Sequence, residues 1–386
     1  MKRLLVEPLD VLMFRSERPF IARESHVAKL GTISPLIFEG ALKSKVLTEF
    51  CKEINYPISK LQRKKGKNEN IDKKFKEEIE KDIQTNKELK YILEAIGYSP
   101  LKFKPKINVI GVFFAKDRRE YFQVPNDLVI NEENKELILL KPTLKEELKI
   151  SGTDLYICFS DYSRIVSIES FISFEGLIKY LEGEIPNKSN FTKRPYINEF
   201  RIGIRIEKRT KTSVEGYLYV AEFLRLKEGW NFIVWYEDYN NLVERYIKNS
   251  PLIRLGGEGK GAICKVIGEI TNIDTQSIID ELNKEKKFKL YIASPAYFGG
   301  YKPNEELLKK YLGVNELKLV GALPGKPVYI GGYDLAMNKE KPLRRWVNAG
   351  AVYYYVFDGK IRDDLTLPIK IVNENVDMRC AFIGRW

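Results

Sequence analysis

Histidine is almost absent from this chain of 386 residues, because His26 is its single histidine. A metal site built on several histidines is therefore excluded, and so is a ribonuclease that works with a pair of them. A Ser-His-Asp triad would have to recruit His26. We interpret His26 as an incidental loop or core residue rather than as a catalytic group.

Cysteine is also scarce. The four cysteines, Cys51, Cys158, Cys264 and Cys380, are each separated from the next by more than 100 residues. Zinc sites built on paired cysteines need short spacings, so the sequence predicts no such site. We expect reduced and mostly buried thiols, which are typical of intracellular proteins.

Long apolar runs are missing as well. The apolar N-terminal residues 4–6 are followed by Glu7, Pro8 and Asp10, which interrupt the run and argue against a signal peptide. No apolar stretch approaches the length of a membrane span. We therefore expect a cytoplasmic protein without a membrane partner.

Positive charge is what the chain has in excess. Lysine and arginine number 65 against 53 acidic residues, which gives a net charge of +12. Such a balance favours a polyanionic partner. Apolar residues make up 44% of the chain, so we expect a globular protein with roughly two to three domains. Abundant lysine and glutamate with little histidine, methionine and cysteine are typical of thermophilic proteins.

The densest glycine segment spans residues 253–262, with Arg254 and Lys260 at its flanks. Glycine allows another backbone to approach closely, and the flanking cations suggest that this backbone is anionic. A P-loop is excluded because Lys260 is followed by Gly261 rather than by serine or threonine. The next residues, 263–267, are typical of a strand, whereas a dinucleotide fingerprint must open a helix, so we predict no cofactor. Taken alone, the segment favours a glycine-rich hairpin with solvated charges.

Strand patterns with one or two helices occur in each half of the chain. A helix is predicted over residues 38–54, and a helical insertion over about 59–105. Residues 182–195 are rich in turn formers and give a boundary between domains at 1–182 and 196–386. This pattern favours an α+β fold of two ferredoxin-like units, without a short-period sequence repeat.

Cations are concentrated in two further segments of the second half. In the strand predicted over 200–207, three isoleucines alternate with Arg201, Gly203 and Arg205. The arginine face suits a nucleic-acid backbone, or it guards the edge of a sheet. Residues 339–345 are predicted to be a basic loop, and the aromatic residues 294–301 either stack a base or pack in the core.

Five segments, in order along the chain, resemble the third subunit of the Cmr complex. That complex is the type III-B CRISPR RNA-silencing effector, and the subunit belongs to the RAMP superfamily. The segments are residues 7–15 with 18–20, 40–44, 255–259, 294–298, and 341–345 with 349–354. Lys43 stands where the family often has arginine, which keeps the charge but loses the planar fork.

The resemblance implies two ferredoxin-like (RRM-related, RAMP) domains packed together. It also implies a non-catalytic subunit for antiviral RNA silencing. This subunit would hold the 5′ handle of the CRISPR RNA and dock on the large polymerase-like subunit. It would also adjoin the backbone RAMP subunits, and target RNA would be met indirectly. We expect RNA binding by Arg15, Arg18, Lys43, Arg201, Arg205, Arg254, Gly256, Gly257, Gly259, Lys260, Arg344 and Arg345.

Two other functions stay open from the sequence. A CRISPR RNA-processing endoribonuclease of the same superfamily would use a histidine near the first helix, and only His26 is available for that role. A protein-binding scaffold module would carry its charge incidentally and would assemble without RNA. Repeat-RNA cleavage that depends on His26 distinguishes the first alternative, and salt-insensitive assembly distinguishes the second.

Overall fold

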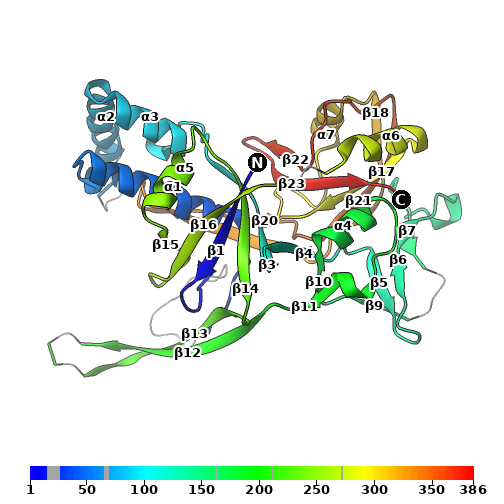
Figure 1. Ribbon diagram of the computed structural model, residues 1–386, viewed down its shortest axis with the longest axis horizontal. Coiled ribbons are helices and arrows are strands. Elements are labelled where there is room, and N and C mark those ends of the chain that lie inside the picture. The colour runs from blue at the N-terminus through cyan, green and yellow to red at the C-terminus, as the bar shows by residue number, and fades with distance from the viewer. Residues whose placement is uncertain (15–26, 65–68, 161–163, 208, 211, 271–272) are drawn as a thin grey trace.

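The largest element of the structure is an eight-stranded antiparallel sheet. The computed structural model describes residues 1–14, 27–64, 69–160, 164–207, 209–210, 212–270 and 273–386 (Figure 1). Apolar residues fill two neighbouring inner strands of this sheet, where Leu4, Val6 and Val234 are fully buried. In their order across the sheet, the strands are β11 (Phe191–Lys193), β10 (Ser170–Ser173), β4 (Arg119–Gln123), β3 (Asn108–Lys116), β14 (Trp230–Glu237), β1 (Lys2–Pro8), β16 (Gly261–Glu269) and β15 (Leu252–Arg254).

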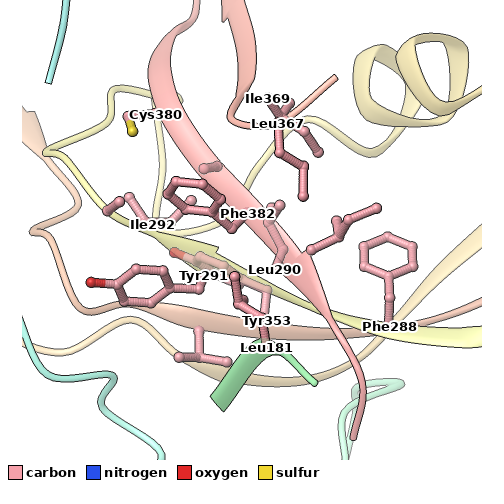
Figure 2. Close-up of a cluster of buried hydrophobic side chains, with 14 of the residues drawn as sticks. Leu181, Phe288, Leu290, Tyr291, Ile292, Tyr353, Leu367, Ile369, Cys380 and Phe382 are labelled. Atoms are coloured by element: carbon pink, nitrogen blue, oxygen red, sulfur yellow. The ribbon is translucent and has the colours of Figure 1, made fainter. Parts of the chain in front are cut away.

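A five-stranded sheet lies toward the C-terminus with two helices beside it (Figure 1). Aromatic and β-branched residues dominate its strands, which suits a pleated, buried surface. Figure 2 shows Leu290, Tyr291 and Phe382 gathered at its centre. The strands, in order, are β18 (Glu316–Leu323), β21 (Val352–Asp358), β17 (Lys287–Ile292), β23 (Asp377–Gly384) and β22 (Ile369–Val372), and the helices are α6 (Thr275–Glu285) and α7 (Glu305–Leu312).

The two sheets share one hydrophobic core. Trp235 of β14 lies edge-on to Phe382 of β23, with ring centroids 6.5 Å apart. The hydroxyl of Tyr291 donates to the carbonyl of Gln123 in β4 at 2.6 Å. Helix α4 (Phe174–Leu181) lies at the same junction, where the Leu181 carbonyl accepts from the Arg385 N–H at 2.7 Å. The sheets are therefore joined by apolar packing and by hydrogen bonds.

A block of helices covers one end of the large sheet (Figure 1). Ser34 caps α1 (Pro35–Glu53), and Asn86 caps α3 (Lys87–Ile96), as the preference of these residues for helix N-termini leads one to expect. Gly97 ends α3 in the left-handed conformation. The remaining helices of the block are α2 (Glu69–Thr85) and α5 (Leu242–Asn249). Helices α2 and α3 lie within the segment predicted to be helical, about 59–105, and its status as an insertion in the first domain stays a prediction.

A long hairpin, which we call the arm, projects from the body (Figure 1). It consists of β12 (Tyr196–Ile206) and β13 (Ser213–Leu226), and β2 (Val27–Ala28) pairs parallel to β13. A second hairpin joins β19 (Val328–Asp334) to β20 (Lys339–Trp346). Two small sheets complete the described chain, one of β5 (Leu128–Asn131), β6 (Leu137–Leu139) and β9 (Ile165–Ser167), and one of β7 (Lys141–Pro142) and β8 (Cys158–Phe159).

The structure confirms the predicted α+β class and corrects one segment. Residues 339–345, predicted as a basic loop, lie in strand β20, whose backbone pairs with β19. As a lysine- and arginine-rich edge strand, β20 tolerates Pro342, and its charges discourage pairing with another edge. The large sheet takes β14 and β16 from beyond the boundary predicted near residue 190, and the division into ferredoxin-like domains stays a prediction. Within the described residues, no helix has the length and apolarity to cross a membrane.

Candidate nucleic-acid interface

The glycine-rich loop joins β15 to β16 and is approached by the chain's own backbone. Gly256 has φ +76°, and a Cβ at this position would lie 2.4 Å from the carbonyl oxygen of Met13. The Gly257 N–H donates to the same carbonyl at 2.8 Å. Gly259 has φ +63° and open space around it. The first two glycines therefore admit residue 13, whereas the backbone predicted from the sequence to approach this loop was a phosphate chain.

Carboxylates neutralise the cations at the base of the arm. Arg201 donates to both oxygens of Asp10, at 3.0 and 3.2 Å, and to Glu199 at 2.7 Å. Arg225 also pairs with both acids, and the Lys260 ammonium lies 3.7 Å from Asp10. Hydrogen bonds from Arg201 and from the backbone lower the pKa of Asp10 to about 2. Those from Arg225 and Arg201 do the same for Glu199, so both acids stay ionised near neutral pH. We call these five residues the arm-base cluster.

The outer face of the arm is apolar and exposed. The predicted alternation along this strand is present, but Arg201 faces the body, where its guanidinium lies 5.4 Å from the centre of the Phe223 ring. On the other face, Phe200 is 62% exposed and Ile202 is 72% exposed. Arg205 lies in β12, and its side chain is outside the described residues. The arginine face of this strand was predicted to hold a phosphate backbone, but the guanidinium of Arg201 is already paired with Asp10 and Glu199.

Lys43 lies on α1 above a buried ion pair. Its ammonium donates to Glu39 at 2.6 Å, and its side chain is 17% exposed. Glu39 also pairs with Arg379 of β23 and accepts from the Val109 N–H at 3.1 Å. Burial alone would raise the pKa of Glu39, but Arg379 and Lys43 hold it below its ordinary value. Burial lowers the pKa of Lys43, with Lys341 of β20 close enough to contribute.

Strand β20 presents cations without acidic partners. Lys339, Lys341, Arg344 and Arg345 are all exposed, and none forms an ion pair with the part of the chain that the structure describes. The hairpin reaches the helical block, where the Arg63 N–H donates to the carbonyl of Ala336 at 2.8 Å. These four cations, which we call the β20 strip, therefore extend from the five-stranded sheet to the helices, with Lys341 near Lys43.

An aromatic side chain accompanies the strip at one position. The guanidinium of Arg344 lies over the ring of Tyr297, 4.8 Å from its centre. Trp346 contacts the same ring, with centroids 5.7 Å apart. Arg344 and Trp346 share one face of the strand, whereas Arg345 is paired with Tyr329 on the other face. Cation and aromatic ring are the two groups that hold single-stranded nucleic acid.

The remaining expected residues divide into two groups. Arg254 is exposed at the end of β15 and forms no ion pair with a described acid. Arg15, Arg18 and His26 lie outside the described residues. The structure brings Lys43 close to the β20 strip and places Arg201 with Lys260 at the arm base, so these described members of the expected set fall into two groups.

Some residues of these surfaces are not among those predicted from the sequence. They include Asp10, Glu199 and Arg225, which decide the charge of the arm base. Lys339 and Lys341 belonged to the predicted basic loop but were not chosen as contacts. Tyr297 was left open between stacking and packing. Only the aromatic character of 294–301 and the basic run of 339–345 signalled this surface in advance.

Together, these features define an α+β protein with antiparallel sheets, a projecting arm and a cationic strand beside an aromatic ring. A family model described as CRISPR-associated protein (Cas_Cmr3) matches residues 4–370. The chain belongs to this family, and the expected identity as the Cmr3-type subunit of the Cmr complex is confirmed. No curated protein matches the sequence.

Solved structures with a similar chain include two of the type III-B Cmr-beta complex. In the complex bound to cognate target RNA and AMPPnP, the identity is 17%, coverage is 92% of this chain and 86% of that chain, and the TM-score is 0.48. With cognate target RNA alone, the identity is 18%, the coverage is the same and the TM-score is 0.46. The Csm3-Csm4 subcomplex of the type III-A interference complex has 13% identity, coverage of 100% and 99%, and a TM-score of 0.40.

Proposed function

We propose that this chain is a non-catalytic, RNA-binding subunit of a type III-B CRISPR effector, and that it holds the 5′ handle of the CRISPR RNA. The observation that carries the proposal is the β20 strip, whose four exposed cations have no described acidic partner. Phosphate oxygens are acceptors for such side chains, and each neutralised phosphate releases counterions. Membership of the Cmr3 family supplies the CRISPR context.

Docking on the large polymerase-like subunit and contact with the backbone RAMP subunits complete the proposal. Large apolar side chains exposed on the arm support a protein-contact role, because contiguous exposed apolar surface marks interaction sites. Co-purification of these subunits with the chain, and of a CRISPR-derived RNA with one shared 5′ handle, is the expected result. A free chain without RNA in the native host would contradict it.

The double variant Arg344→Ala, Arg345→Ala tests the RNA contact. Each lost phosphate contact is expected to cost on the order of 1 kcal/mol, about fivefold in affinity, and to reduce the dependence of affinity on salt. The measurement is the Kd of the full chain for handle RNA at several salt concentrations. Lys73→Ala, Lys74→Ala on the exposed face of α2 is the matched control, since it removes the same charge elsewhere. Equal losses in both variants, or no loss in either, would contradict the assignment to β20.

The absence of catalysis is tested separately with repeat RNA. The full chain is expected to leave a labelled CRISPR repeat RNA intact. A nuclease needs a positioned, titratable group, and we interpret the single histidine, His26, as an incidental residue. Cleavage by the wild type that disappears in His26→Ala would replace this proposal with the processing endoribonuclease.

A further inference from the structure

We propose that Tyr297 and Arg344 form a stacking site for one unpaired nucleobase of the bound RNA, with Trp346 packed against the tyrosine ring. This inference rests on the proposed RNA-binding function and assigns it a base contact in addition to its phosphate contacts. Three observations carry it: the fixed backbone of Tyr297, the contacts of its ring with Arg344 and Trp346, and the cations nearby that have no described acidic partner.

Tyr297 is held in place from two sides. Its N–H donates to the Asp377 carbonyl at 2.8 Å, and its carbonyl accepts from the Asp377 N–H at 2.9 Å. The preceding residue, Ala296, exchanges two backbone hydrogen bonds with Val347, at 2.9 and 2.8 Å. The side chain of Asp377 is in turn paired with Arg379. Because its backbone is already fixed by these hydrogen bonds, Tyr297 loses little further conformational entropy on binding. A preorganised contact requires this.

The ring of Tyr297 contacts two side chains of β20. Arg344 lies over it, and Trp346, which is 6% exposed, packs against it from the same strand face. Tyr297 itself is only partly buried, and Arg344 is exposed to solvent. Unpaired bases stack on tyrosine rings and on guanidinium planes, so this group offers both kinds of surface in one place.

The charge around this group favours RNA over an apolar protein segment. Arg344 carries no described acidic partner, and Lys341 lies three residues before it on the same strand. Lys341 is also near enough to Lys43 to influence its pKa. A base stacked on Tyr297 would therefore have its flanking phosphates beside cations that no described acid neutralises.

The opposite face of the hairpin offers a matched control. Tyr329 is 46% exposed and is paired in register with Arg345, so it is also an exposed tyrosine beside an arginine. No contact between its ring and Trp346 is found among the described residues. Tyr329→Ala therefore removes an exposed tyrosine beside the other arginine of the hairpin without touching the proposed site.

The test uses the full chain and single-stranded handle RNA, together with a series of the same RNA in which one base at a time is replaced by an abasic ribose. Tyr297→Ala is expected to weaken binding of intact RNA about tenfold. It should have no effect on one abasic RNA, because that RNA lacks the base that stacks. Tyr297→Leu, which keeps apolar packing against Trp346, should behave like Tyr297→Ala, whereas Tyr297→Phe and Tyr329→Ala should bind like the wild type.

An equal loss on every RNA of the series would overturn the stacking site and make Tyr297 a structural residue. Retention of full affinity in Tyr297→Leu would overturn it too. Both results leave the proposed function intact as long as Arg344→Ala, Arg345→Ala weakens binding. Failure of the wild-type chain to bind any of these RNAs would overturn both proposals together.

Discussion

Two groups of cations look alike in the sequence and have opposite surroundings in the fold. At the arm-base cluster, three cations share the carboxylates of Asp10 and Glu199. On the β20 strip, four exposed cations have no acidic partner in the described chain. A polyanion is attracted by the charge that remains after such pairing. The difference teaches that the position of the acids, and not the number of cations, points to the RNA surface.

The surroundings of Lys43 are intermediate between those of the arm-base cluster and those of the β20 strip. It contacts Glu39, which Arg379 already neutralises, so three charged groups share one buried position beneath the strip. Breaking an ion pair inside a protein leaves a charge without compensation, and this costs far more than breaking one at the surface. The expected effects below therefore decrease from the buried pair to the exposed cluster.

The largest effect is expected from Glu39→Gln. This substitution leaves Arg379 buried with Asp377 alone and frees Lys43, so we expect the free energy of unfolding to fall by about 3 kcal/mol. The measurement is urea denaturation of the full chain at pH 7. The double variant Glu39→Leu, Arg379→Met removes both charges and should lose less than the single variant. If Glu39→Gln were as stable as the wild type, the Glu39–Arg379 pair would contribute nothing to stability. The buried pair would then not differ in this respect from the exposed arm-base cluster and the β20 strip.

Periodicity in the sequence was sufficient to predict many elements. The helix predicted over 38–54 corresponds to α1 (Pro35–Glu53), and the strand patterns at 200–207 and 263–267 correspond to β12 and β16. These segments have strong local signals, which caps and apolar spacing supply. The order of strands was not predictable, because β14 pairs with both β1 and β3 through contacts that span more than 100 residues.

The candidate site was predictable only in part for the same reason. Arg201 and Asp10 are 191 residues apart, so nothing near Arg201 in the sequence reveals that its charge is neutralised. The glycines at 256 and 257 were correctly read as permitting close approach, but the residue that approaches, Met13, comes from a distant segment. Strand β20 was not predicted because lysines, arginines and a proline have little strand propensity. It forms because its partner β19 supplies the backbone hydrogen bonds.

Lys289 extends the comparison to a cation that is fully buried. Its ammonium lies 3.3 Å from the centre of the Tyr180 ring and has no hydrogen-bond partner among the described residues. Burial lowers the pKa of Lys289 from 10.5 to about 7, against the opposing charge of Asp127. Because the folded pKa lies below the unfolded one, the unfolded chain binds more protons between these values. The contribution of Lys289 to the free energy of unfolding should therefore rise with pH across this window.

Lys289→Met is expected to remove this pH dependence. The slope of the wild type should exceed that of the variant by at most about 1.4 kcal/mol per pH unit between pH 7 and 10. This difference cancels the contribution of the buried cysteines, whose raised pKa values act in the opposite direction. Urea denaturation at a series of pH values measures it. Lys287→Met, on the same strand and partly exposed, is the control that should retain the slope. Equal slopes in the wild type and in Lys289→Met would contradict a buried, titrating ammonium.

The smallest effect on stability is expected from Asp10→Asn, which makes the arm base resemble the strip. The pKa of Asp10, about 2, is below its ordinary value of 3.8, so its ion pairs persist above that value and are lost as the pH falls toward 2. At pH 7 the substitution should release Lys260, whose acidic partner in the described chain is Asp10, and leave Glu199 to pair with both Arg201 and Arg225. The added net charge should raise the affinity for single-stranded RNA and steepen its salt dependence by about one unit of log–log slope. Asp154→Asn, which removes an exposed acid paired with Lys149 and with Lys318 of β18, is the control.

The decisive comparison for Asp10→Asn is made in the Arg344→Ala, Arg345→Ala background. If pairing with acids prevents the arm base from binding RNA, Asp10→Asn should restore part of the RNA affinity that the double variant has lost. Asp154→Asn should not restore it. A gain of the same size in both acid variants would show that net charge alone governs binding. The distinction between the arm-base cluster and the β20 strip would then not describe how this protein holds RNA.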